Sequence, residues 1–236
     1  MPDAEYVIAH SLLERAGIRT ETGANAEERA RRLAVSIADT ESIPTVALYV
    51  TVLALELYGA EYDRASVAES LTARQDEISG GSYEYPQSAG SSARISAEDT
   101  AASLMTYMLI RGSVRTQVLE DTLHDSALVY LGNCIQNDNT VLNAEGVSSS
   151  VATARVLTAL LVCGVPMDGE ISTALLNAIR TFAVKNGGAL IGYRDTADDD
   201  PKRSTAAEIL FCVTAALYGN PYFAETQHPA SGAVIN

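Results

Sequence analysis

Four stretches of the chain are apolar on nearly every side, and each is followed closely by a glycine. They cover residues 44–58, 97–111, 149–163 and 204–218. The closing glycines, Gly59, Gly112, Gly164 and Gly219, follow one another at intervals of about 52–55 residues, which is typical of a helical repeat. A helix that is apolar all round has to be buried, so these stretches are predicted to form the inner helices of the fold.

Segments with one apolar and one polar face lie between the apolar stretches. They cover residues 4–15, 25–39, 63–76, 114–131 and 169–185. Loops rich in glycine and asparagine follow, and the alternation typical of strands never runs for more than a few residues. The pattern therefore predicts an all-α fold in which outer amphipathic helices surround the apolar inner ones.

The repeat also predicts the domain organisation. Because each repeat buries its apolar face only against its neighbours, residues 1–223 are expected to form a single domain. Residues 224–236 carry no helical pattern and are expected to form an irregular tail.

The composition excludes some partners. A net charge of −14 disfavours nucleic acids and anionic membrane surfaces, which attract basic proteins. No uncharged apolar run reaches about 18 residues, so no transmembrane segment is expected. The three cysteines, Cys134, Cys163 and Cys212, show no spacing typical of a zinc site.

Three sequence motifs resemble a known superfamily. The loops Gln-Asp-Glu-Ile-Ser-Gly-Gly-Ser-Tyr (75–83) and Asn-Gly-Gly-Ala-Leu-Ile-Gly-Tyr (186–193) and the Ser-Thr-Ala helix at 204–219 are similar to motifs of the α/α toroids. This superfamily comprises terpenoid cyclases, protein prenyltransferase β subunits, thioester-containing complement domains and cobalamin carriers. The resemblance covers about residues 43–221. It implies an α/α toroid, incomplete because four clear inner helices are present where a closed ring usually has six.

The catalytic motifs of that superfamily are missing. The acidic segment 195–200 reads Asp-Thr-Ala-Asp-Asp-Asp, which differs from the Asp-x-Asp-Asp motif of the cyclases. The chain has no tryptophan for their QW repeats, no Gly-Cys-Gly-Glu-Gln thioester motif and no zinc-ligand spacing of the prenyltransferase kind. The resemblance therefore indicates the fold more than the reaction.

Two polar residues stand out in the inner helices. Arg155 lies among apolar residues, and Glu208 occupies the corresponding part of the next inner helix. A buried charge needs a partner, so we expect an ion pair between them. Either the pair is structural, or both side chains line a central cavity and hold a polar ligand.

Acidic residues suggest two further sites. Asp99 lies three residues after Ser96, which is the spacing of a capping box, and the alternative role for Glu98 or Asp99 is acid catalysis. Asp195, Asp198 and Asp200 offer oxygen ligands for Ca²⁺, although the EF-hand spacing is missing and a solvated acidic loop is the alternative.

Tyrosines follow the Gly-Gly pairs of two equivalent loops. Tyr83, Tyr85 and Tyr193 are expected to flank a cavity mouth, where they would contact a sugar, a peptide or an apolar ligand, or else to pack their own loops. Tyr107, within the second inner helix, faces either the core or the cavity.

Three functions compete on these grounds. The first is a non-catalytic domain that binds a small molecule, a glycan or a protein, with no cofactor, in a bacterial secreted or surface protein as the resemblance implies. The second is an enzyme acting on an isoprenoid substrate through Glu98, Asp99 or Glu208. The third is a carrier of a corrinoid or another cofactor, by analogy with the cobalamin carriers.

Overall fold

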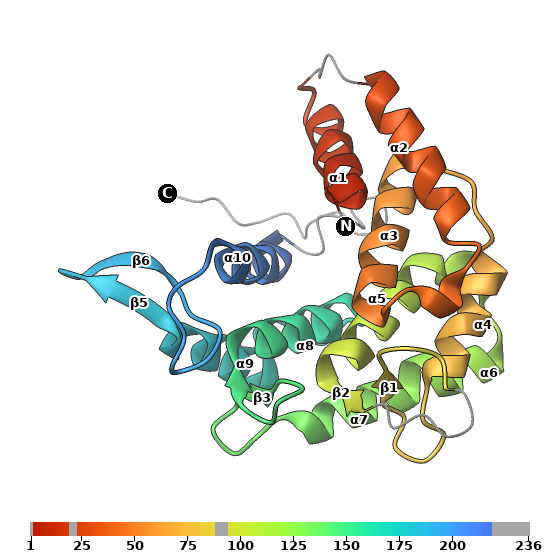
Figure 1. Ribbon diagram of the computed structural model, residues 1–236. Coiled ribbons are helices and arrows are strands. Elements are labelled where there is room, and N and C mark those ends of the chain that lie inside the picture. The colour runs from red at the N-terminus through yellow and green to blue at the C-terminus, as the bar shows by residue number, and fades with distance from the viewer. Residues whose placement is uncertain (1, 19–22, 88–93, 219–236) are drawn as a thin grey trace. The chain divides into compact units, whose positions relative to one another are not determined.

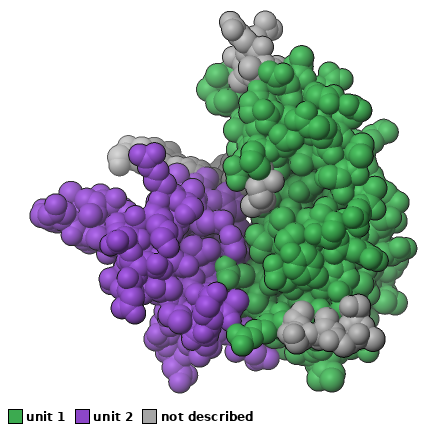
Figure 2. Space-filling view, viewed as in Figure 1, with its two compact units in different colours: residues 1–132 green, residues 133–236 purple. Residues whose placement is uncertain are grey.

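The computed structural model describes residues 2–18, 23–87 and 94–218, and 64% of it is helical (Figure 1). The chain divides into two compact units, which Figure 2 colours separately: unit 1 comprises Met1–Gly132 and unit 2 comprises Asn133–Asn236. Each unit is described by itself, and the expectation of a single domain over residues 1–223 stays a prediction. The expected tail, 224–236, lies outside the described residues.

The helices fall where the hydrophobic pattern predicts them. Unit 1 holds α1 (Pro2–Arg15), α2 (Gly23–Ser36), α3 (Thr45–Tyr58), α4 (Arg64–Arg74), α5 (Ala97–Val114), the short α6 (Gln117–Leu119) and most of α7 (Ala127–Cys134), and a short 3-10 turn, η1 (Thr40–Ser42), precedes α3. Unit 2 holds α8 (Ser150–Val162), α9 (Glu170–Thr181) and α10 (Arg203–Tyr218). No helix in the described ranges is long and apolar enough to cross a membrane.

Local polar groups set several of these helix ends. Asp63 caps α4 by accepting hydrogen bonds from the amides of Ala65 and Ser66, and Ser149 caps α8 by accepting one from Ala152. At the C-terminal end of α3, Gly59 adopts a φ of 76°, a left-handed conformation that glycine reaches without a steric penalty.

In the described part of the chain, three short hairpins lie in segments where the sequence pattern predicted loops and no strands. They are β1 (Ser82–Tyr83) with β2 (Ile95–Ser96), β3 (Val141–Leu142) with β4 (Ser148–Ser149), and β5 (Ala183–Asn186) with β6 (Ala189–Tyr193), all antiparallel. Strands of two residues are too short to show an alternating pattern. The expectation of helix through residue 185 was also wrong, because α9 ends at Thr181 and the next residues pair with β6.

Backbone carbonyl groups near two hairpins cap two helix starts. In unit 1, the amide and hydroxyl of Thr45 at the start of α3 donate to the carbonyl oxygens of Glu84 and Tyr83, at 2.8 and 2.7 Å. In unit 2, the amide and hydroxyl of Ser150 at the start of α8 donate to the carbonyl oxygens of Asp195 and Arg194, at 2.8 and 2.9 Å. Each pair of carbonyl oxygens thus satisfies the first donors of a helix.

The helices that follow the first two hairpins, α5 and α8, each receive a hydrogen bond from a strand of the hairpin before them. Ser82 in β1 donates its amide to the hydroxyl of Thr100, and Val141 in β3 does the same to Thr153. Each threonine in turn donates to the carbonyl one turn earlier, at Ser96 or Ser149. One buried hydroxyl therefore joins strand and helix at both junctions.

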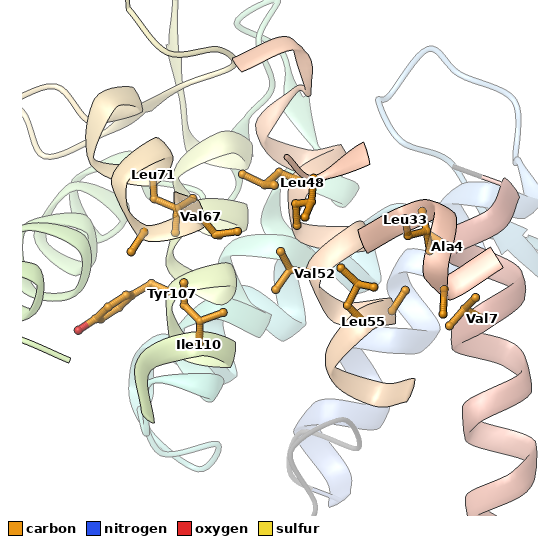
Figure 3. Packing of buried hydrophobic residues seen from close by; sticks show 14 of the residues in the cluster. Ala4, Val7, Leu33, Leu48, Val52, Leu55, Val67, Leu71, Tyr107 and Ile110 are labelled. Carbon is orange, nitrogen blue, oxygen red and sulfur yellow. The ribbon is translucent and has the colours of Figure 1, made fainter. Parts of the chain in front are cut away.

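The core of unit 1 is centred on α3. Leu48, Val52 and Leu55 are fully buried and pack against residues of α1, α2, α4 and α5, as Figure 3 shows. The apolar character of residues 44–58 is therefore explained by burial. In unit 2, α8 packs against both α9 and α10. Each of these helices has buried apolar residues, among them Val156, Leu175 and Ile209.

A π-helical turn, Glu120–Ser126, lies between α6 and α7. The side-chain amide of Gln75 donates to the carbonyl oxygen of Thr122 in this turn, at 2.5 Å, and to that of Gly80, at 3.1 Å. The loop behind it fits closely, since a Cβ at Gly80 would lie 2.6 Å from the carbonyl oxygen of Ser126. A carbonyl group of the wider π turn thus accepts a hydrogen bond from a side chain outside the turn. The hydrophobic pattern of the sequence could not predict this bond.

Candidate functional site

Asp99 lies in the first turn of α5, whose N-cap is Ser96. The Ser96 hydroxyl accepts from the Asp99 amide at 3.0 Å and donates to the Asp99 carboxylate at 2.5 Å. The Ser96 cap that the spacing predicts is confirmed. A carboxylate in the first turn of a helix also stabilises the positive end of the helix dipole.

Asp99 and Tyr85 both lie close enough to Arg74 to act on its charge. Arg74 is fully buried, and its guanidinium donates to the carbonyl oxygens of Thr40, Ile43 and Glu84 and to the hydroxyls of Thr45 and Ser70. Burial lowers its pKa to about 10, which still leaves it charged at neutral pH. Arg74 therefore ties α4 to the start of α3. Tyr85 itself is 39% exposed.

Tyr107 is buried in the core of unit 1, and its hydroxyl points away from the apolar cluster (Figure 3). It donates to Glu120 at 2.6 Å, and Arg111 and Arg115 form ion pairs with the same carboxylate. The hydrogen bonds from Arg111 and the other donors hold the pKa of Glu120 at about 2. Of the two alternatives for Tyr107, the structure therefore supports the core.

Arg155 and Glu208 form the expected ion pair in unit 2. The Arg155 Nη2 and Glu208 Oε1 atoms are 2.9 Å apart, on α8 and α10. Their side chains are 21% and 36% exposed, so the pair is only partly shielded from water. The pairing is confirmed, and the pair links two packed helices.

The acidic segment after β6 has a structural role at one residue. Asp195 Oδ1 accepts hydrogen bonds from the Ser149 hydroxyl, at 2.5 Å, and from the Val151 amide, at 3.1 Å, which caps α8. Asp198 and Asp200 are not brought to it as a cluster: over the described ranges, no three His, Cys, Asp or Glu side chains are placed to hold a metal ion. Asp199 instead fixes its own turn through Thr196 and Lys202.

Tyr193 ends β6 and is half-buried. Its neighbour Arg194, which the sequence analysis did not single out, accepts at its carbonyl oxygen from the hydroxyl of Ser150. Arg194 lines a pocket that Tyr193 does not line.

Two open pockets lie side by side on unit 2. The first, the α9 groove, has a volume of about 560 Å³ and runs along α9. The second, the hairpin pocket, has a volume of about 500 Å³ and lies between the β3–β4 hairpin and the segment that follows β6. Asp138 and Thr181 line both. Each volume is in the range of small-molecule sites.

Both pockets combine polar and apolar lining. The α9 groove is lined by polar side chains such as Asp138, Glu170 and Asn177 and by the small apolar residues Ala174 and Ala178. The hairpin pocket combines the carboxylate of Asp138 and the guanidinium of Arg194 with apolar surface from Leu142, Val147 and Phe182. The sequence held one signal for this site, the polar loop around Asp138, but periodicity could not place it against α9.

The six residues proposed for ligand binding thus belong to different local structures. Tyr85, Asp99 and Tyr107 lie in unit 1, and Arg155, Tyr193 and Glu208 lie in unit 2. None of them lines the α9 groove or the hairpin pocket. Comparison with protein-family models and with curated proteins finds no match for this chain.

Proposed function

We propose that this chain is a non-catalytic binding domain of the α/α-toroid kind, and that the α9 groove and the hairpin pocket together hold its ligand. The toroid assignment draws support from the apolar helices and from the matched capping bonds at Thr45 and Ser150. The observation that carries the binding site is the pair of adjoining pockets that share Asp138 and Thr181.

Binding is favoured over catalysis by the roles of the acidic candidates. The Asp99 carboxylate accepts from the hydroxyl of the N-cap Ser96, and Glu208 is paired with Arg155, whereas a general acid has to carry a proton beside its substrate. The pockets, by contrast, are lined by hydroxyl, amide and charged side chains together with apolar ones. That combination suits recognition of a polar ligand.

A thermal-unfolding screen tests this proposal. The panel contains glycans, amino acids, short peptides, isoprenoid diphosphates, corrinoids and Ca²⁺, and it is run on the wild type and on Thr181→Trp. Thr181 is exposed and lines both pockets, so an indole there would fill the site without disturbing the core. Ile171→Trp is the matched control, because Ile171 is also exposed on α9 but lines neither pocket.

The expected result is a ligand that raises the midpoint by several degrees at about a hundredfold excess over its dissociation constant. The shift should persist in Ile171→Trp and disappear in Thr181→Trp. A ligand that stabilises Thr181→Trp as strongly as the wild type would place the binding site elsewhere and contradict the proposal. Turnover of an isoprenoid diphosphate would contradict its non-catalytic part.

A further inference from the structure

Two opposite charges line the hairpin pocket without neutralising each other. Asp138 and Arg194 both border it, yet neither forms an ion pair with the other or with any other side chain among the described residues. Such charges attract a ligand that brings the complementary pair, because each can form a charge-assisted hydrogen bond.

The guanidinium of Arg194 has one nitrogen with a hydrogen-bond partner and one buried nitrogen without a partner. Its Nη1 donates to the carbonyl oxygen of Ala197 at 2.7 Å, while Nε is buried without a partner. A buried donor without an acceptor is costly, so a small rotation of the guanidinium toward an anion would be favourable. The backbone of Arg194 is held separately, through the hydroxyl of Ser150, so the side chain can change without loss of the α8 cap.

The Asp138 carboxylate is fixed on the opposite chain segment. Its Oδ1 accepts hydrogen bonds from the amide and hydroxyl of Thr140, at 3.0 and 2.7 Å. These bonds lower the pKa of Asp138, so the group stays ionised. The Thr140 hydroxyl is also 2.8 Å from that of Ser148. Since its single proton goes to the carboxylate, Ser148 is the donor of this second bond.

From this geometry we propose that the hairpin pocket binds a free α-amino acid with an apolar side chain. The ligand carboxylate pairs with Arg194, the ligand ammonium pairs with Asp138, and the side chain contacts Leu142, Val147 and Phe182. The inference rests on the proposed function and names its ligand class. A zwitterion is neutral overall, so the net charge of −14 does not repel it.

Calorimetric titration with L-leucine and two blocked analogues tests the inference. Leucine methyl ester lacks the carboxylate, and N-acetyl-leucine lacks the ammonium. The wild type should prefer leucine to either analogue by about tenfold or more, because each blocked group removes a charge-assisted bond. Arg194→Gln should lose the preference over the ester, and Asp138→Asn should lose the preference over the acetylated form.

Arg180→Gln and Asp198→Asn serve as controls, since both side chains are exposed in unit 2 and line neither pocket. They should bind leucine as the wild type does. Absence of leucine binding, or equal affinity for all three compounds, would overturn the inference. If another compound of the thermal screen still protects the wild type but not Thr181→Trp, the proposed function survives that failure. If no compound does, both fail.

Discussion

Arg74 shows how much one side chain can hold in this fold. It is fully buried, and it binds backbone or hydroxyl oxygens of α4, η1, the start of α3 and the segment after β1. In sequence, Arg74 looks like an ordinary basic residue in the last turn of a helix. Its burial could not be predicted, because the acceptors come from segments far away in the chain.

Replacement of Arg74 by methionine should therefore destabilise the protein strongly. Several buried carbonyl oxygens would lose their donor, and we expect the free energy of unfolding to fall by about 3 kcal/mol or more. Urea unfolding followed by circular dichroism measures this loss. The control is Arg31→Met, whose exposed side chain pairs with Glu28 on the surface, and which should cost less than about 1 kcal/mol. Similar losses for both variants would contradict the assigned role of Arg74.

Glu120 makes stability depend on pH in a defined window. Hydrogen bonds, first from Arg111 and also from Tyr107, lower its pKa to about 2 in the folded protein, below the usual value of 4.5. The folded state therefore binds fewer protons, so the contribution of Glu120 is complete above about pH 4.5 and is lost as the pH falls through about 2.

Glu120→Gln should cost about 2 kcal/mol at pH 6, and the difference from the wild type should shrink between pH 4.5 and 2. Urea unfolding of both proteins across this range measures it. Glu69→Gln, an exposed change on α4, should stay within about 0.5 kcal/mol of the wild type throughout. If the two proteins differ in unfolding free energy by the same amount down to pH 2, the ionisation of Glu120 does not contribute to stability as predicted.

At the scale of elements, the positions of the long helices follow from the sequence, and the segments between them do not. The inner stretch 149–163 matches α8 (Ser150–Val162), and 44–58 matches α3 (Thr45–Tyr58), because their apolar pattern and flanking caps are local signals. The strands β1 to β4 are only two residues long, and the π turn depends on a partner distant in the chain, Gln75, which donates to the carbonyl oxygen of Thr122. No local pattern reports such a bond.

The close fit of the loop against the π turn predicts that alanine substitutions at Gly80 and Gly112 change stability in opposite directions. Gly80→Ala should be strongly destabilising, by about 2 kcal/mol or more, because Gly80 has a φ of 77° and the new Cβ would meet the backbone of Ser126. Gly112→Ala, in α5 with open space around it, should stabilise the protein by up to about 1 kcal/mol. Thermal unfolding midpoints that move in the same direction for both variants would contradict this packing.

The cap of α8 predicts a difference between neighbouring aspartates. Asp195→Ala should lower stability by about 1–2 kcal/mol, since it removes the acceptor for Ser149 and Val151, whereas Asp198→Ala should change it by less than about 0.5 kcal/mol. Chemical unfolding with and without Ca²⁺ should give the same loss for Asp195→Ala. A loss that appears only with Ca²⁺ would instead support the metal site that the sequence suggested.

At the scale of the whole molecule, the candidate site could be predicted only in part. The Arg155–Glu208 pair and the Ser96 cap of α5 follow from burial and spacing. The pockets of unit 2 do not, because they arise where the loop around Asp138, the surface of α9 and the segment at Arg194 meet, three segments separated in sequence. Such a surface depends on tertiary packing, whereas periodicity reports only which face of each helix is buried.

The most direct measurement of the central claim is an amide NMR titration of the ¹⁵N-labelled chain with L-leucine and with any compound that the thermal screen identifies. The account predicts chemical-shift changes concentrated at Asp138–Ser148, along α9 and at Arg194–Ala197, the segments that line the two pockets. Shifts concentrated in unit 1, around Tyr85 and Asp99, or at the Arg155–Glu208 pair would contradict it and move the binding site to those residues.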